Sequence, residues 1–234
     1  MSADWSTGVR GRAELRFENL REKALAGVES LEPTSATPDG WCLSTIARLI
    51  HNAPDLVPAV ATLQERLGDV GPLYLYPAES LHISLLGCTQ REPDRMLPDG
   101  PRAQRVRAAV ADVLVDHPPV AVEIGRLNLI GDQFFLEVLT DSEDWSATRK
   151  RLGAAMSAIG ERAISYSDAE PVHLNIARVT GEPDVGVVRD VLLDPGFTAS
   201  ATAVLDTVEL VVTDFVVRPD RVEVVDRFRT TARA

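Results

Sequence analysis

Hydrophobic and polar residues alternate along this 234-residue chain with two different periods. Segments in which every second residue is apolar, or in which a short apolar run lies between turn-forming residues, are typical of β-strands. Such segments are residues 41–49, 81–88, 120–129, 133–139, 172–179, 203–214 and 221–228, with a short strand or bend at 73–76. Segments whose apolar residues recur every three or four positions predict helices at residues 8–30, 54–67, 102–115, 145–159 and 185–193.

The order of these elements predicts an α+β protein with two lobes. Ile130-Gly131-Asp132 is a hairpin signal between two of the strands, and Arg218-Pro219-Asp220 is a turn signal between the last two. We therefore expect two mainly antiparallel sheets with outer helices and a central cleft. Residues 1–40 should form an N-terminal helix and a linker, and residues 41–234 the bilobal domain.

Two of the predicted strands carry a histidine followed two residues later by a polar residue. They are Leu81-His82-Ile83-Ser84-Leu85 and Val172-His173-Leu174-Asn175-Ile176. Alternate side chains of a strand lie on one face, so His82 shares a face with Ser84, and His173 with Asn175. Two such strands facing one cleft would bring two imidazoles to one substrate as general acid and general base. The alternative interpretation is two half-buried strand histidines whose ring nitrogens are satisfied within the protein.

Charge and composition limit the classes of partner. The formal net charge is −11 and the sequence pI is near 4.8, so bulk nucleic-acid binding is not expected. A locally basic cleft can still bind one phosphate or a short oligonucleotide end. No apolar segment is long enough to span a bilayer and the first residues lack a signal-peptide pattern, so we expect a cytoplasmic protein. Cys42 and Cys88 form no metal-binding pattern and are expected to be reduced and buried.

The two histidine motifs make the chain similar to the two-histidine (2H) phosphoesterase superfamily, which contains cyclic phosphodiesterases and the so-called 2′-5′ RNA ligase proteins. Members carry two His-x-Thr/Ser-x motifs on core strands in the two halves of one domain. His82-Ile83-Ser84-Leu85 matches the first motif fully, and His173-Leu174-Asn175-Ile176 matches the second except at Asn175. The resemblance covers about residues 41–229 and implies the bilobal fold of that superfamily.

The resemblance also implies an activity: metal-independent hydrolysis of a cyclic phosphate or of a short nucleotide or oligonucleotide phosphodiester. His82 and His173 would be the catalytic acid and base, in an order that the sequence leaves open. Ser84 and Asn175 would bind substrate by donating hydrogen bonds to the non-bridging phosphate oxygens. No cofactor and no metal is expected, and the implied partner is a nucleotide or an RNA terminus.

The remaining candidates are weaker. Tyr74 and Tyr76 precede the first motif strand and are candidates to stack on a base, although aromatic residues at such positions more often belong to the core. His51 is expected in a loop and His117 at a helix end, where a cation is favourable, and neither is expected to be catalytic.

Two other classes of function compete with the phosphodiesterase. Asn175 leaves open a non-catalytic module that binds a cyclic nucleotide or an RNA end. A zinc hydrolase is disfavoured because neither motif carries a second ligand at metal-binding spacing.

Overall fold

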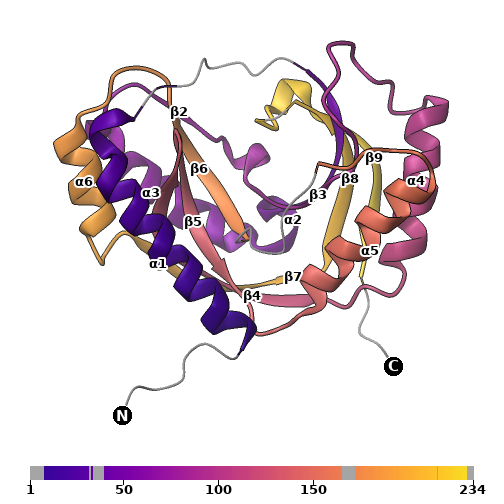
Figure 1. Ribbon diagram of the computed structural model, residues 1–234, viewed down its shortest axis with the longest axis horizontal. Helices are drawn as coiled ribbons and strands as arrows, with labels where there is room; N and C mark the ends of the chain where they lie inside the picture. Colours follow the sequence, from indigo (N-terminus) through magenta and orange to yellow (C-terminus); the bar gives the residue numbers. More distant parts are fainter. Residues whose placement is uncertain (1–7, 32, 34–39, 165–171, 215, 231–234) are drawn as a thin grey trace.

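The computed structural model describes residues 8–31, 33, 40–164, 172–214 and 216–230 (Figure 1). Its helices are α1 (Val9–Gly27), α2 (Leu49–Asn52), α3 (Val57–Arg66), α4 (Pro101–Leu114), α5 (Asp144–Ala158) and α6 (Val185–Leu193). Its strands are β1 (Cys42–Arg48), β2 (Leu73–Leu75), β3 (His82–Gly87), β4 (Val120–Ile130), β5 (Gln133–Leu139), β6 (His173–Val179), β7 (Thr198–Leu205), β8 (Thr207–Thr213) and β9 (Glu223–Arg229). The predicted α+β class is confirmed. The predicted elements lie within a few residues of their predicted positions with one exception, and the short helix α2 was not predicted.

An antiparallel sheet runs through the molecule in the strand order β7-β4-β5-β6-β3-β1-β8-β9, and β2 also pairs with β6. The strands form a first lobe of β2 and β4–β7 and a second lobe of β1, β3, β8 and β9, which stand at an angle to each other in Figure 1. Where the lobes meet, the described ladder between β3 and β6 consists of one pair, Ile83 with Leu174. The two sheets expected from the sequence are thus joined into one hydrogen-bonded path.

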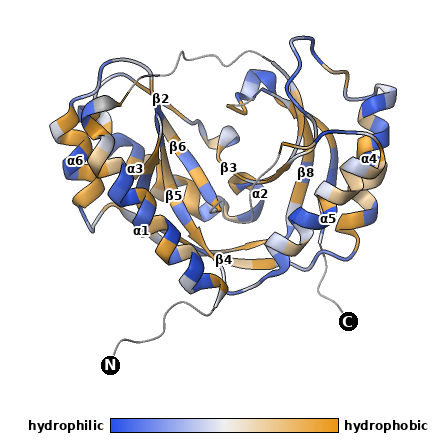
Figure 2. Ribbon diagram, in the orientation of Figure 1, coloured by the Kyte–Doolittle hydropathy of each residue, from blue (hydrophilic) through white to orange (hydrophobic). Residues whose placement is uncertain are grey.

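The helices pack on different parts of this sheet (Figure 1). In the second lobe α4 and α5 pack against each other, and they contact β9 and β3 respectively. In the first lobe α3 contacts β6 and β7, α6 contacts β4, and α1 crosses β4 and β5. The strands β4 and β5 are mainly hydrophobic in Figure 2, whereas α1 alternates between hydrophilic and hydrophobic bands. None of the described helices is both long and apolar enough to cross a membrane.

The two faces of the sheet differ in what they bury. Ile83 and Leu174, the apolar residues at the centres of the two motifs, are fully buried in the main hydrophobic core. Two smaller apolar clusters are separate from that core: Phe17 with Phe135 and Leu139, and Ile46 with Val211 and Val217. Because side chains alternate along a strand, burying the central motif residues in the main core leaves their polar neighbours on the other face.

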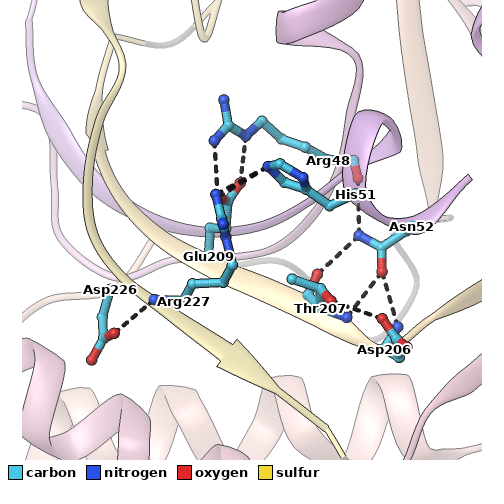
Figure 3. A network of polar contacts seen from close by, with 8 residues as sticks. All are labelled: Arg48, His51, Asn52, Asp206, Thr207, Glu209, Asp226 and Arg227. Atoms are coloured by element: carbon cyan, nitrogen blue, oxygen red, sulfur yellow. Dashed lines mark hydrogen bonds and ion pairs between the residues drawn. The ribbon is translucent and has the colours of Figure 1, made fainter. Parts of the chain in front are cut away.

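The exception is residues 203–214, where the sequence pattern predicts one continuous strand. The chain instead forms β7, which pairs with β4, and β8, which pairs with β1. Asn52 holds the break: its Oδ1 accepts from the backbone N–H groups of Asp206 and Thr207, and its Nδ2 donates to the carbonyls of Arg48 and Thr207, all at 2.9 Å (Figure 3). The chain therefore passes from one lobe to the other at Asp206.

Candidate functional site

His82 is held by the turn that precedes β3. Its Nδ1 lies 2.7 Å from the carbonyl oxygen of Ser80. A carbonyl oxygen only accepts hydrogen bonds, so Nδ1 carries the proton and Nε2 is left as the basic ring nitrogen. Ser80 is itself fully buried, and its hydroxyl donates to the carbonyl of Val217 at 2.5 Å. The orientation of the imidazole is therefore fixed from two segments of the second lobe.

His173 and Asn175 lie in the first half of β6. The ring centroid of His173 is 5.3 Å from that of Phe135 on β5. The Oδ1 atom of Asn175 is buried and has no hydrogen-bond partner among the described residues. The amide nitrogen is therefore the end of this side chain that the surrounding space can reach. That orientation suits a phosphate, whose oxygens accept hydrogen bonds.

The pairing of β3 with β6 sets the relative positions of the four motif residues. Ile83 opposes Leu174 in an antiparallel ladder, in which the flanking residues oppose each other in turn. The ladder therefore places two cross-strand neighbours on the other face: His82 beside Asn175, and Ser84 beside His173. The two histidines occupy diagonal positions about an approximate two-fold axis through the Ile83–Leu174 pair.

The strands on either side of β3 and β6 add one charged residue beside each motif histidine. Arg48 on β1 pairs with His82, and Glu137 on β5 pairs with His173. Directly opposed residues project on the same face, with Cβ atoms about 5 Å apart. Each motif histidine thus has a charged neighbour on the strand outside it, a guanidinium beside His82 and a carboxylate beside His173.

A cavity of about 410 Å³ lies over this face of the sheet. All four motif residues line it: His82, Ser84, His173 and Asn175. Its other walls come from α1, the β4–β5 turn, β5, β1, the end of β8 with the chain just after it, and Ile164 after α5. The volume is at the lower end of the range of about 300–1,000 Å³ that is usual for small-molecule sites. The structure therefore brings together, in a space of ligand size, two motifs about ninety residues apart in sequence.

The charges of the cavity wall differ from the basic cleft that the sequence suggested. No arginine or lysine is among the described residues that line it. Two carboxylates do line it, and each faces an arginine behind the wall: Asp132 lies 3.4 Å from Nη1 of Arg178, and Asp214 lies 2.5 Å from Nε of Arg218. The wall thus offers hydrogen-bonding groups with little net charge. Within the described residues, no three His, Cys, Asp or Glu side chains are grouped so as to hold a metal ion.

The environment of His82 keeps its ring neutral. Burial lowers the pKa of His82 to about 4, against the hydrogen bond to Ser80, which favours the charged form. The positive charges of His173 and Arg48 are smaller contributions to the same lowering. At neutral pH the Nε2 atom of His82 is therefore able to accept a proton.

A strained turn closes the cavity after β8. Val217 has a φ of 57°, is 4% exposed and lines the cavity. Such a conformation is rare for a β-branched residue and costs about 1–3 kcal/mol. Asp214 Oδ1 holds the turn by accepting from the backbone N–H groups of Val216 and Arg218 at 3.1 and 3.2 Å. The Val217 carbonyl, which accepts the hydrogen bond of the Ser80 hydroxyl, is thus held in place by this strained turn.

A buried carboxylate on β8 orients the arginine beside His82 (Figure 3). Glu209 is fully buried and accepts from both Nε and Nη2 of Arg48, the latter at 2.9 Å, and from Arg227 at 2.8 and 3.0 Å. Burial alone would raise the pKa of Glu209, but the bonds to the two arginines outweigh it and the pKa is lowered. The carboxylate is therefore ionised and fixes Arg48 in place.

The remaining candidates from the sequence lie outside the cavity lining. Tyr74 and Tyr76 are in edge-to-face contact with ring centroids 5.3 Å apart, and neither lines the cavity. Tyr76 is 1% exposed and belongs to the main core, against which the partly buried Tyr74 also packs. The expected stacking of these rings on a base thus has no support from their placement.

The other two histidines differ from their predicted surroundings. His51 lies in the short helix α2 rather than in a loop, with Nε2 3.5 Å from Glu209. His117 is fully buried after the end of α4, and its Nδ1 is 3.0 Å from Oγ1 of Thr148. Burial lowers the pKa of His117 to about 4, so it is a neutral core residue rather than a cation at a helix end.

Several cavity residues could not be identified from the sequence patterns. Leu20 is one apolar position among several on a helix, and Phe135 is one of several apolar residues in a strand. Both line the cavity only because β5 lies next to β6 and α1 packs over it. Asp132 was visible only as part of a hairpin signal. Knowledge of the strand order would have been needed to place these residues in the site.

Comparison with known proteins agrees with this geometry at the level of the fold. No family model and no curated protein matches the chain. Among solved structures, TT0787 of Thermus thermophilus is similar with a TM-score of 0.58 and 13% identity, over 82% of this chain and 100% of that one. E. coli LigT in complex with 3′-AMP is similar with a TM-score of 0.55 and 12% identity, over 83% of this chain and 99% of that one. A protein described as a phosphoesterase has a TM-score of 0.55 and 12% identity, over 82% of this chain and 99% of that one. The chain therefore has the fold of LigT and these related structures, and the predicted bilobal α+β architecture is confirmed.

Proposed function

We propose that this protein is a phosphodiesterase of the 2H type that hydrolyses a cyclic phosphate or a short nucleotide phosphodiester, with His82 and His173 as acid and base. One observation carries the proposal: two imidazoles, a hydroxyl and an amide line one cavity in diagonal positions of one antiparallel strand pair. E. coli LigT has been crystallised with 3′-AMP, with ATP and with NADP⁺. A nucleotide is therefore the substrate class that we propose here.

The two histidines would have different roles. The neutral Nε2 of His82 would take the proton of the attacking water as its oxygen bonds to phosphorus. His173 would donate a proton to the leaving ribose oxygen as the phosphorus–oxygen bond breaks, which leaves a phosphomonoester. The assignment of His82 as base rests on its bond to the Ser80 carbonyl and on its lowered pKa.

The polar partners of the histidines would stabilise the transition state. Ser84 and the amide nitrogen of Asn175 are suited to donate hydrogen bonds to the non-bridging oxygens, whose negative charge grows as water attacks. The position of Asn175 beside His82, with its own oxygen turned into the protein, supports this role.

The first test is hydrolysis of nucleoside 2′,3′-cyclic phosphates by the wild type and by two single variants. His82→Ala and His173→Ala should each lower kcat/KM by about a hundredfold or more while the circular dichroism spectrum stays that of the wild type. The matched control is His51→Ala, which removes a histidine outside the cavity and should keep wild-type activity. Incubation with EDTA should not change the rate. Loss of activity on chelation, restored by zinc or manganese, would contradict the proposal.

A second test separates the base from the acid. A nucleoside 3′-(p-nitrophenyl phosphate) has a leaving group that needs no protonation. With this substrate His173→Ala should recover most of its lost activity relative to wild type, whereas His82→Ala should stay impaired. The reverse pattern would exchange the two roles.

The third test concerns Asn175, where the chain departs from the motif. Asn175→Ala should lower kcat by about a hundredfold, the usual cost of one oxyanion donor, and Asn175→Ser should restore a large part of it. If the wild type consumes no cyclic or linear substrate but binds nucleotides, and Asn175→Ala weakens that binding, the alternative of a non-catalytic binding module holds instead.

A further inference from the structure

The N-terminal helix α1 packs on the sheet face that carries His173. Phe17 of α1 is fully buried against Phe135, with ring centroids 6.1 Å apart, and Phe135 in turn contacts His173. One turn further along the helix, Leu20 packs against the same cluster and lines the cavity. The helix is therefore a wall of the candidate site.

This wall separates the site from a second hollow. Leu20, Ile130 and Gly131 line the site cavity, and the same three residues line a neighbouring hollow of about 420 Å³. The lining of that hollow also includes Lys23, three residues along α1 from Leu20. Leu20 and the β4–β5 turn thus form a partition between the two hollows. On one side of it is the site cavity, whose described lining has no lysine or arginine, and on the other is the hollow lined by Lys23.

Buried polar contacts hold the partition in position. Arg21, next to Leu20, is 9% exposed; its Nη2 donates to Glu137 and its Nη1 to the carbonyl of Leu192, both at 2.7 Å. Asn128 Nδ2 donates to the carbonyl of Phe17 at 2.9 Å and to Glu137 at 3.0 Å. The Phe17 carbonyl is thus bonded to β4, and the Arg21 side chain is bonded to β5 and α6, so α1 is a fixed wall rather than a lid.

The lining of the cavity suits a substrate with one phosphate group. No lysine or arginine is among its described residues, and the parts of the chain outside the described residues contain, by sequence, one cationic residue, Arg233. A second phosphate within the cavity would meet the apolar and near-neutral wall without a cation to bind it.

From these observations we propose that Leu20 is a specificity-determining residue: with the β4–β5 turn it restricts the site to a single nucleotide with one phosphodiester and excludes a chain that continues beyond it. The inference rests on the proposed function. Removing the Leu20 side chain would join the two hollows and give a second nucleotide access to Lys23.

The test compares kcat/KM for adenosine 2′,3′-cyclic phosphate and for the adenosine dinucleotide that ends in the same cyclic phosphate. The wild type should prefer the mononucleotide by about tenfold or more, because differences of small apolar groups in a pocket are worth about that much. Leu20→Ala should raise the relative kcat/KM of the dinucleotide about tenfold, and Leu20→Phe should lower it. Leu15→Ala is the matched control, since Leu15 is on the same helix, 58% exposed and outside both hollows.

Lys23 provides an independent check. Lys23→Ala alone should leave the turnover of both substrates unchanged, but in the Leu20→Ala background it should reverse the gain for the dinucleotide. Thermal melting of each variant confirms that it is folded.

Each outcome separates this inference from the proposed function. If the wild type hydrolyses both substrates equally well, or if Leu20→Ala changes both equally, the inference is overturned while the phosphodiesterase stands. If neither substrate is consumed, calorimetric binding of 3′-AMP and of the dinucleotide 3′-phosphate takes the place of turnover. If the wild type binds 3′-AMP more tightly than the dinucleotide and Leu20→Ala removes that preference, the role of Leu20 is supported and the hydrolytic activity is not. If neither ligand binds, both the role of Leu20 and the proposed function are overturned.

Discussion

The burial of His117 gives a prediction that can be worked out as a free energy. The ring is fully buried, Nδ1 is bonded to Thr148, and Nε2 has no hydrogen-bond partner among the described residues. Burial lowers its pKa to about 4 in the folded protein, whereas an exposed histidine in the unfolded chain titrates near about 6.5. The two states therefore bind different numbers of protons over the pH range between these values.

The sign of the effect follows from which state binds the proton. Above about pH 6.5 the ring is neutral in both states and contributes no pH dependence. Between that value and about pH 4 the unfolded chain is protonated and the folded protein is not, so the free energy of unfolding falls as the pH falls. At about 1.4 kcal/mol per pH unit, the full loss for His117 is about 3 kcal/mol, of which about 2 kcal/mol has occurred by pH 5.

The perturbation is His117→Gln, which keeps a partner for the Thr148 hydroxyl and does not titrate. Urea unfolding of the wild type and the variant at pH 7.5 and pH 5.0 gives four free energies. Between these two pH values the wild type should lose about 2 kcal/mol more than the variant, because every other titrating group is common to both proteins and cancels. An equal loss in the two proteins would show that His117 titrates normally when folded, and would refute the argument from burial.

Three further predictions concern stability and are read from the same urea midpoints. Gly87→Ala would place a Cβ 2.7 Å from Cδ1 of Ile164 and should destabilise the protein by about 1–3 kcal/mol. The control is Gly153→Ala in α5, where the added Cβ meets open space, and it should stabilise the protein by up to about 1 kcal/mol. Equal effects of the two substitutions would contradict the crowding at Ile164. Phe17→Ala should cost about 3–5 kcal/mol because the ring is fully buried between α1 and β5, and a cost below about 1 kcal/mol would mean that α1 is not docked as described. Glu209→Gln should cost about 2 kcal/mol or more because it removes the charge that two arginines bind, and an unchanged midpoint at low salt would show that the network adds no stability.

The elements whose pattern is local were predictable from the sequence. Period-2 alternation identified both motif strands, and it also showed which residues of each strand belong to the core: Ile83 and Leu174 are buried as their pattern indicates. Helical periodicity identified α6 with its observed bounds, and α1 to within three residues at either end. These signals depend on neighbours within a few positions, which the chain order itself supplies.

The tertiary structure alone decided what the motif residues face. The diagonal arrangement of His82 and His173 depends on one backbone pair between strands ninety residues apart. The break at Asp206 depends on the amide of Asn52, more than 150 residues earlier in the chain. The alternation of apolar and polar residues is the same whether a strand ends or continues, so no local pattern shows the break between β7 and β8.

The same reason explains the errors and omissions at the site. For a residue just before a strand or just after a helix, the sequence pattern does not indicate whether the side chain is buried. The packing of distant elements buried both His117 and Tyr76 in the core. The neutral lining of the cavity and the wall formed by Leu20 arise where α1, β5 and the turn after β8 meet. The sequence determined which groups could do chemistry, whereas the long-range strand pairing and helix docking determined which of them share a cavity, because those contacts join residues whose separation along the chain carries no information about their distance in space.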